Sequence, residues 1–298
     1  MFFQCAVWMD AMQPITRILI VAALLLIALV GSPYASGTSS ETDTDPPFAE
    51  HDALFDLYQP YIENISGYKP VYFLIGVRPE DTKFQLSMKY RFINQEMPLA
   101  QKYPWMRGFH FAYTQTSFWD LEGDSKPFED TSYKPEVFFL SQNLFSGRGR
   151  AHGFIQGGFE HESNGQSGDT SRSTNYAYIK PIFVYYHEKS KTGFQVAPKI
   201  WTYAANSDST NPNLHKYRGY FNLELKIGRA DRFVAQTHWR WAEKGHSVSV
   251  DLSYPMDRLI NLNPQLYLHA QYVNALAESL LDYTERNEAL RIGFSIVR

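Results

Sequence analysis

Cysteine and charge are both scarce in this chain. Cys5 is the single cysteine among 298 residues, and it precedes an apolar segment of the kind that export removes. The mature chain then has no thiol, which excludes disulfides, a cysteine nucleophile and a cysteine-based metal site. Charged residues make up 20% of the chain and the formal net charge is -3. There is no basic excess that would bind nucleic acid, and we expect no nucleic-acid partner.

Long hydrophobic runs are also missing, apart from Ile18–Gly31. The mean hydropathy of -0.36 argues against a bundle of transmembrane helices, each of which needs about 20 apolar residues. The run follows Arg17, is short and leads into small residues, as in a secretory signal peptide. We therefore expect residues 1–37 to be a signal peptide, with a retained helix as the alternative. Residues 38–70 are expected to be a disordered lead-in that includes a short helix or a plug.

Aromatic residues are abundant, at 16%, and from about residue 71 apolar and polar residues alternate. In Lys83–Ile93 one face carries only apolar side chains and the other carries Lys, Gln, Ser and Arg. Tyr220–Gly228 and Leu290–Ile296 repeat this alternation. Strands of about nine to eleven residues are typical of transmembrane barrels, whereas the strands of a soluble sandwich average about five or six. The sequence therefore predicts an all-β fold, a transmembrane antiparallel β-barrel of about 12 strands over residues 71–298.

The segment that carries chemistry is 157–181. By the strand period, His161 and Ser163 share the odd-numbered, lipid-facing side with Phe159, while Glu162 faces the lumen. A histidine and a serine two residues apart on one face can act as general base and nucleophile.

Turn-forming residues follow over 164–174, and strand character resumes at Asn175. In an antiparallel hairpin Asn175 can lie opposite His161 and orient its imidazole, the task of the third member of a hydrolytic triad. From spacing alone, the alternative that His161 and Ser163 are interfacial residues near a barrel rim stays open. Five tryptophans are expected to form an interfacial girdle: Trp105, Trp119, Trp201, Trp239 and Trp241.

One block of residues resembles the outer-membrane phospholipase A family. It consists of His161-Glu162-Ser163-Asn164-Gly165 followed by Thr170-Ser171-Arg172-Ser173-Thr174-Asn175. Weaker resemblance extends through 113–119, 127–135, 216–220, 252–255 and 278–283, and so covers most of the chain from about residue 83 to the end. This resemblance implies a twelve-stranded barrel in the outer membrane of a Gram-negative bacterium. The implied activity is calcium-dependent hydrolysis of acyl esters in phospholipids and lysophospholipids by a homodimer.

The resemblance also assigns roles to individual residues. Ser163 would be the nucleophile, His161 the general base, Asn175 its orienting partner, and the Gly165 N–H the oxyanion donor. Calcium (Ca2+) would be bound by the Ser171 hydroxyl and the Gln166 carbonyl, completed by Ser125 from a second subunit. Gln115 matches a polar residue buried at the contact between subunits. At an auxiliary calcium site the family has aspartates where this chain has Gly168, with Asp169 one step later, and Thr210, with Asp208 nearby.

Two readings from other functional classes remain. A passive porin, or a catalytically inactive barrel, would keep the fold and predicts solute flux without ester hydrolysis. A soluble β-sandwich that binds a ligand is disfavoured by the length of the strands. The joint presence of serine, histidine and asparagine at matching spacing favours the enzyme.

Overall fold

The computed structural model describes residues 64–122, 128–145, 150–206, 210–229, 231–259 and 266–298. The expected signal peptide and most of the lead-in, up to residue 63, lie outside this part of the chain, as do Ser125 and Asp208. Thirteen strands make up one antiparallel sheet. They are β1 (Ile65–Gly67), β2 (Val71–Gly76), β3 (Thr82–Arg91), β4 (Phe109–Trp119), β5 (Phe128–Leu140), β6 (Ala151–Ser163), β7 (Ser173–His187), β8 (Thr192–Tyr203), β9 (Phe221–Gly228), β10 (Val234–Ala242), β11 (Gly245–Pro255), β12 (Tyr267–Leu276) and β13 (Arg286–Val297).

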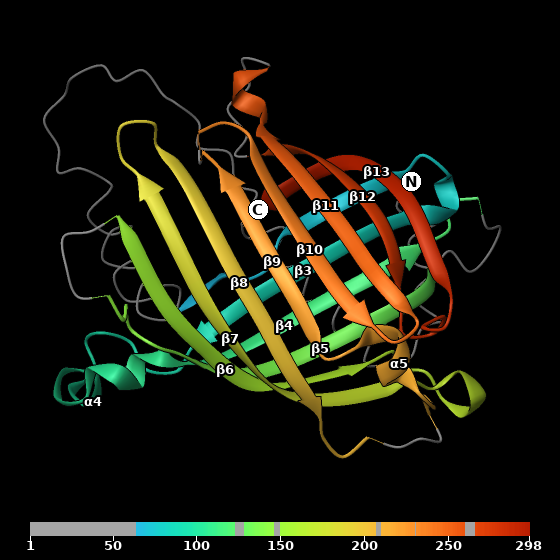
Figure 1. Ribbon diagram of the computed structural model, residues 1–298, viewed down its shortest axis with the longest axis horizontal. Coiled ribbons are helices and arrows are strands. Elements are labelled where there is room, and N and C mark those ends of the chain that lie inside the picture. The colour runs from blue at the N-terminus through green and yellow to red at the C-terminus, as the bar shows by residue number, and fades with distance from the viewer. Residues whose placement is uncertain (1–63, 123–127, 146–149, 207–209, 230, 260–265) are drawn as a thin grey trace, which may run out of the picture. The chain divides into compact units, whose positions relative to one another are not determined.

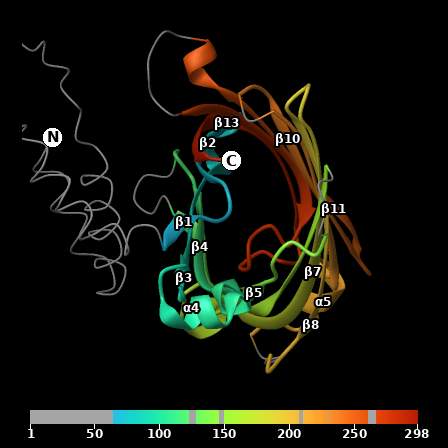
Figure 2. The same cartoon turned by 90° about the vertical axis from the view of Figure 1, so that its left-hand side faces the viewer.

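Strands β2 to β13 close into a twelve-stranded barrel. Each pairs with its neighbour in sequence, and β2 pairs with both β3 and β13, which closes the sheet on itself. Figure 1 shows the tilted strands side by side, and Figure 2 looks into the closed ring. Closure pairs every strand with two neighbours and so removes the free edges that a sandwich keeps. The predicted all-β barrel is therefore confirmed, and the β-sandwich alternative is wrong.

Strand β1 is a thirteenth, accessory strand beside β3. Gly67 lies opposite Met88, and Tyr72 lies opposite Gln85. The four residues 68–71 thus span the length that only two residues, 86 and 87, occupy on β3. This excess pushes the connection into the barrel interior (Figure 2), where Tyr68 donates a hydrogen bond to Glu136 (3.0 Å).

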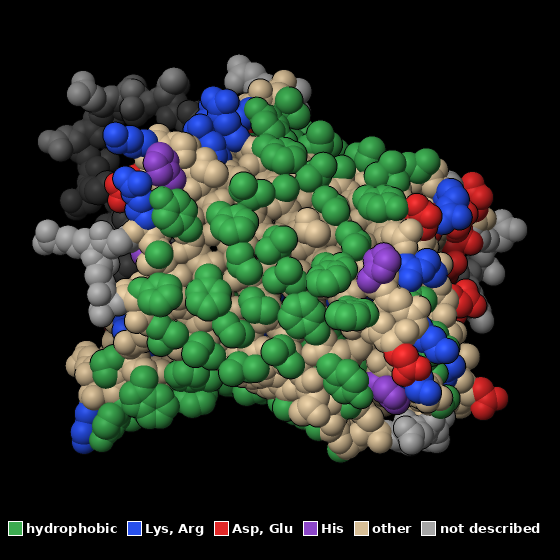
Figure 3. All heavy atoms as spheres, viewed as in Figure 1, with side chains coloured by type: hydrophobic (Ala, Val, Ile, Leu, Met, Phe, Trp, Pro, Cys, Tyr) green, Lys and Arg blue, Asp and Glu red, His purple; other side chains and the backbone are tan. Residues whose placement is uncertain are grey.

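The outer wall is apolar across most of its height. Figure 3 shows a broad hydrophobic band with charged side chains gathered at the two ends of the barrel. Exposed side chains on this wall include Phe73, Val137, Phe159, Ile179, Phe183, Ile200, Ile227, Tyr272, Leu290 and Ile292. Such a belt between polar rims is the outer surface of a membrane-spanning barrel. Among the described residues, no helix is long and apolar enough to span a membrane.

The interior is crossed by ion pairs and hydrogen bonds. Glu160 accepts hydrogen bonds from Lys199 (2.9 Å) and Tyr176 (2.6 Å), and Glu278 pairs with Lys83 (3.0 Å) and Arg291 (2.8 Å). Trp201, expected in the interfacial girdle, lies in this interior with 7% of its surface exposed. It shares strand parity with Gln195 and Lys199, which also face inward. An interior that is crossed by ion pairs and hydrogen bonds does not suit the passive-porin alternative, which needs an open path for solutes.

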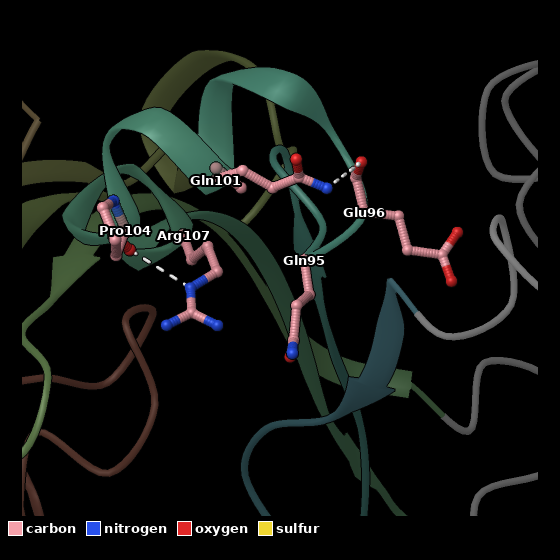
Figure 4. Close-up of a pocket in the computed structure, with 6 residues that line it drawn as sticks. Gln95, Glu96, Gln101, Pro104 and Arg107 are labelled. Atoms are coloured by element: carbon pink, nitrogen blue, oxygen red, sulfur yellow. Dashed lines mark hydrogen bonds between the residues drawn. The ribbon is translucent and has the colours of Figure 1, made fainter.

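The strand connections are mostly short. They hold the helices α4 (Pro98–Lys102) and α5 (Leu214–Arg218) and the 3-10 helices η1 (Pro79–Asp81), η2 (Pro104–Gly108), η3 (Gly168–Thr170) and η4 (Met256–Arg258). A hollow of ≈ 430 Å³ lies in the β3–β4 connection (Figure 4). Two of its polar side chains, Gln101 and Arg107, donate to main-chain carbonyls of that same connection. This hollow holds no paired acid, base or nucleophile.

Candidate active site

The candidate site is carried by the paired strands β6 and β7. On β6, Glu160 and Glu162 are buried toward the lumen, whereas His161 and Ser163 are half-buried on the outer side. Phe159, on the same outer side, is 47% exposed. The alternation read from the sequence is therefore confirmed, and it sets the histidine and the serine on the wall that faces lipid.

His161 and Asn175 are direct cross-strand partners. Their side chains meet, with 2.7 Å between His161 Nδ1 and Asn175 Oδ1. An amide oxygen only accepts hydrogen bonds, so this contact places the donor at Nδ1, and in the neutral imidazole Nε2 then keeps its lone pair. The contact with Asn175 therefore favours the tautomer in which Nε2 can accept a proton.

Ser163 lies in a row of four side chains that crosses the outer wall. Gln115 on β4 is the partner of Tyr133 on β5, Tyr133 is the partner of Ser163, and Ser163 is the partner of Ser173 on β7. Within the described part of the chain, the Ser163 hydroxyl makes no side-chain hydrogen bond, so no bond restrains its rotation toward His161. The row also brings Gln115 onto the same surface as the serine, one strand removed from it.

The loop 164–172 is held in shape by Asn164, a residue that is 2% exposed. Its side-chain oxygen accepts from the main-chain N–H of Arg172 (2.9 Å) and of Gln166 (3.3 Å), and its amide donates to the Thr170 carbonyl (2.9 Å). Sequence reasoning gave Asn164 no role. Its position directly after Ser163, at the start of a turn-rich stretch, was the available signal.

Gly165 has a backbone conformation that suits glycine. Its φ is 67°, and a Cβ at this position would lie 2.9 Å from the Tyr133 ring. Within the described part of the chain, its N–H donates no hydrogen bond. The Gly165 N–H, which the resemblance assigns as the oxyanion donor, is therefore not used by another group of the described chain. It lies two residues after Ser163.

The oxygens assigned to calcium fit a hard cation. Every carbonyl from residue 167 to residue 172 accepts a hydrogen bond. Among the described residues, the Gln166 carbonyl and the Ser171 hydroxyl have no such bond, so both remain available as ligands. Asp169, at the auxiliary site, is exposed in η3. Among the described residues, no group of three or more histidine, cysteine, aspartate or glutamate side chains is placed to hold a metal ion.

Two asparagines from the β8–β9 connection complete the edge of β7. The pairing of β7 with β8 ends at Tyr176 and Tyr203, so residues 173–175 lack a strand neighbour on that side. Asn206 accepts from the Asn175 N–H (2.7 Å) and donates to its carbonyl (3.1 Å). Asn211 makes the same two bonds with Ser173, at 3.1 and 2.7 Å. Two side-chain amides thus replace the missing strand, an arrangement that sequence reasoning missed.

On the lumen side, Glu162 anchors the strand between the two candidate catalytic residues. It contacts Arg218 of α5 at 2.5 Å and Lys134 of β5 at 3.4 Å. Its side chain is only 1% exposed. The expectation that Glu162 faces the lumen is confirmed, and its ion pairs fix the part of β6 on which His161 and Ser163 are carried.

Several known proteins resemble this chain. The phospholipase A1 of Escherichia coli (strain K12) is 28% identical over 82% of this chain and 82% of its own length. The phospholipase A1 of Salmonella typhimurium is 28% identical over 95% of this chain and 98% of its own. Among solved structures, outer-membrane phospholipase A from Escherichia coli superposes with a TM-score of 0.64 at 23% identity, covering 78% of this chain and 98% of that one.

A second solved structure is the Salmonella typhi outer-membrane phospholipase dimer with bound calcium. Its TM-score is 0.64 at 22% identity, and the match covers 83% of this chain and 96% of that one. At such identities these two structures support the fold alone. The profile of the family described as Phospholipase A1 matches residues 61–296. The chain is therefore an outer-membrane β-barrel enzyme that belongs to the phospholipase A1 family.

Proposed function

We propose that this enzyme hydrolyses acyl esters of membrane phospholipids and lysophospholipids, with calcium, as a homodimer. The observation that carries the proposal is the 2.7 Å contact between His161 Nδ1 and Asn175 Oδ1 on the lipid-facing wall. A site on that wall meets lipid laterally from the bilayer, so the substrate need not leave the membrane. The passive barrel, by contrast, gives no reason for an oriented histidine in an apolar belt.

The residues can divide the chemistry as follows. The Ser163 hydroxyl attacks the ester carbonyl while His161 Nε2 takes its proton, which Asn175 permits by holding the other nitrogen protonated. The Gly165 N–H donates to the oxyanion that forms on the carbonyl oxygen. His161 then gives its proton to the departing alcohol oxygen. Water hydrolyses the acyl-serine by the same steps in reverse.

Calcium is assigned to the Gln166 carbonyl and the Ser171 hydroxyl, with Ser125 from the partner subunit. A bound divalent cation would supply positive charge beside the oxyanion. The support is that these two oxygens have no hydrogen bond among the described residues, whereas the carbonyls of residues 167–172 each accept one. Ser125 itself lies outside the described residues.

The proposed dimer contact is the outer wall around Gln115. Its side chain bonds to Tyr113 (3.2 Å) and Ser117 (3.4 Å). Ser117 is fully buried, whereas Tyr113 and Gln115 are half-buried on the outward side of β4. A polar group facing lipid is costly unless another protein surface covers it. Because the row from Gln115 leads through Tyr133 to Ser163, a subunit seated there would also border the candidate nucleophile.

The test is fatty-acid release from mixed phospholipid micelles by refolded protein, with calcium and with chelator. We expect hydrolysis that requires calcium and that is lost in Ser163→Ala and in His161→Ala. Sedimentation in the same detergent should show dimers whose fraction rises with calcium. A heat-modifiable barrel that releases no fatty acid under any condition, or a Ser163→Ala variant with wild-type activity, would defeat the proposal.

A further inference from the structure

The connection between β3 and β4, residues 92–108, projects from one end of the barrel (Figure 1). It holds α4 and η2 and leads into Phe109, the first residue of β4. Phe109 shares a cross-strand row with Phe139 and Gly157. Gly157 precedes Ser163 by six residues on β6, which is about 20 Å along an extended strand. A ligand of this connection is therefore remote from the candidate nucleophile.

The connection exposes several large apolar side chains. More than a third of the surface is exposed in each of Phe92, Met97, Leu99, Tyr103 and Trp105. Apolar surface left in water costs about 25 cal/mol per Å², and a group of such side chains usually marks a contact with a protein or a membrane. Which of the two covers this connection follows from its position on the barrel wall.

Trp105 continues the lipid-facing wall beyond the end of β4. Its ring centroid lies 5.9 Å from that of Phe109 and 6.3 Å from that of Phe139. On β4, Phe109 shares the outer face with the exposed Phe111, and on β5, Phe139 shares it with the exposed Val137. In Figure 3 the apolar band reaches the corner where Figure 1 places α4. Tryptophan and tyrosine favour the membrane–water interface, so the lipid leaflet is the occupant that this surface fits.

A cation lies beside this apolar surface with its terminal nitrogens free. Arg107 lines the hollow of ≈ 430 Å³ together with Gln95 and Gln101. Its Nε donates to the Pro104 carbonyl (3.2 Å), and among the described residues its two terminal nitrogens make no hydrogen bond or ion pair. Figure 4 shows these nitrogens and the Gln95 amide pointing to the same side, with the Glu96 carboxylate pointing away from them. An accessible guanidinium of this kind can bind two oxygens of one phosphate group.

The whole end of the barrel that carries this connection is basic. In the described parts of its five strand connections, 92–108, 141–150, 188–191, 229–233 and 256–266, there are eight lysines and arginines but four aspartates and glutamates. The connections at the other end hold five and nine. In Figure 3 the basic side chains gather at the left end and the acidic ones at the right. A basic rim attracts headgroups with a net negative charge and repels the amine of a zwitterionic one.

We propose that the β3–β4 connection binds an anionic phospholipid of the surrounding bilayer. Leu99, Tyr103 and Trp105 would lie among the acyl chains and glycerol groups of the leaflet, and Arg107 would hold the headgroup phosphate. The lipid bound here lies away from Ser163 and is not the one that the candidate site would cleave. The proposal thus goes beyond the proposed function and does not depend on it.

The test uses refolded Ser163→Ala protein without calcium, so that no lipid is hydrolysed. The protein is placed in bilayers of phosphatidylcholine and phosphatidylglycerol, in which one lipid or the other carries brominated acyl chains. Bromine quenches indole fluorescence only at short range, and the contribution of Trp105 is the difference between the parent and its Trp105→Phe variant. We expect quenching by both lipids and a relative binding constant about 5-fold in favour of phosphatidylglycerol, the effect of one cation near an anionic surface.

Arg107→Gln should bring this preference close to 1, whereas Arg107→Lys keeps the charge and should keep most of it. Lys244→Gln removes a charge from an exposed turn at the other end of the barrel and should behave like the parent. Heat-modifiability on gels reports whether each variant has folded, and Arg107→Met, which keeps an unbranched side chain, replaces Arg107→Gln if that variant does not refold. Three results would overturn the proposal: no quenching of the Trp105 signal, equal quenching by the two lipids, or a preference that persists without the charge at residue 107.

Discussion

Asn206 holds Asn175 by both of its main-chain polar groups, at 2.7 Å from the N–H and 3.1 Å to the carbonyl. The Asn175 carbonyl also accepts from the Ala204 N–H (2.9 Å). Asn175 in turn is the residue whose side chain meets His161. The geometry of the imidazole therefore depends on the Asn206 side chain, which bonds the main chain of Asn175 and makes no hydrogen bond to His161.

Replacing Asn206 with alanine should lower kcat by roughly 10- to 100-fold, the range that a misplacement of about 1 Å can cause. Two hydrogen bonds to β7 are lost, so Asn175 no longer has a fixed position relative to His161. The measurement is fatty-acid release alongside heat-modifiability on gels, which reports whether the barrel has folded. Asn211→Ala is the matched control, because it removes the same two bonds from Ser173. An equal loss of kcat in both variants would mean that the two hydrogen bonds from Asn206 affect activity only through the stability of the barrel.

Gly165→Ala should abolish most of the activity, because alanine at a φ of 67° is strained and its Cβ would lie 2.9 Å from the Tyr133 ring. Relieving that contact turns the N–H away from the oxyanion, and removal of one such donor typically costs about 10²- to 10³-fold in kcat. Gly168→Ala is the matched control. It has a φ of 66° but nothing within 4 Å of the new Cβ. Both variants therefore carry the backbone strain of alanine at a positive φ, and only Gly165→Ala adds a clash. Similar kcat values for the two variants would argue against the Gly165 N–H as the donor.

The barrel and the pair of candidate catalytic residues could be predicted because they follow a local rule. Alternation along β6 places His161 and Ser163 outward. The antiparallel register between β6 and β7 then places Asn175 opposite His161. The same parity, applied to β8, would have placed Trp201 inside with Lys199. The girdle expectation is wrong for Trp201, because position along the strand and not residue type decides which face of the barrel a side chain takes.

The hydrogen bonds of Asn206 and Asn211 to β7 and the charge pairs of the barrel interior could not be predicted from strand alternation. Asn206 and Asn211 lie 31 and 38 residues from the groups they bond, in a connection that has no periodic pattern. The entry of Tyr68 into the lumen depends on four residues lying opposite two on β3, a mismatch that only pairing reveals. Such features are decided by which distant segments meet, and one sequence does not contain that information.

Ser171→Ala should raise the calcium concentration needed for half-maximal hydrolysis and should change the maximal rate less than it changes that concentration. The change removes one oxygen ligand of the proposed calcium site and leaves the Gln166 carbonyl in place. Calcium titrations of fatty-acid release provide the measurement. Ser167→Ala, in the same loop, removes a hydroxyl that is assigned no ligand role and should titrate like the wild type. Identical calcium curves for all three proteins would remove Ser171 from the site.

Glu278 joins the β12–β13 connection to the barrel interior. It pairs with Lys83 (3.0 Å) and Arg291 (2.8 Å) and accepts from Asn287 (2.7 Å). Burial opposes its ionisation, but attraction to Lys83 and Arg291 is stronger and holds the pKa of Glu278 well below its usual range. A carboxylate with a lowered folded-state pKa stabilises the fold above its unfolded pKa of about 4.3. That contribution is lost as the pH falls below this value toward the folded pKa.

Glu278→Gln should therefore destabilise the barrel at neutral pH by roughly 3–5 kcal/mol, since it leaves two buried cations without their anion. The difference from the wild type should stay constant above about pH 6 and shrink as the pH falls below about 4.3. Urea unfolding of refolded protein, followed by tryptophan fluorescence from pH 3 to pH 8, measures both. Glu285→Gln, an exposed residue in the same connection, should have little effect at any pH. A destabilisation that is the same at pH 3 and pH 7 would show that packing of the side chain, and not its charge, is what the barrel uses.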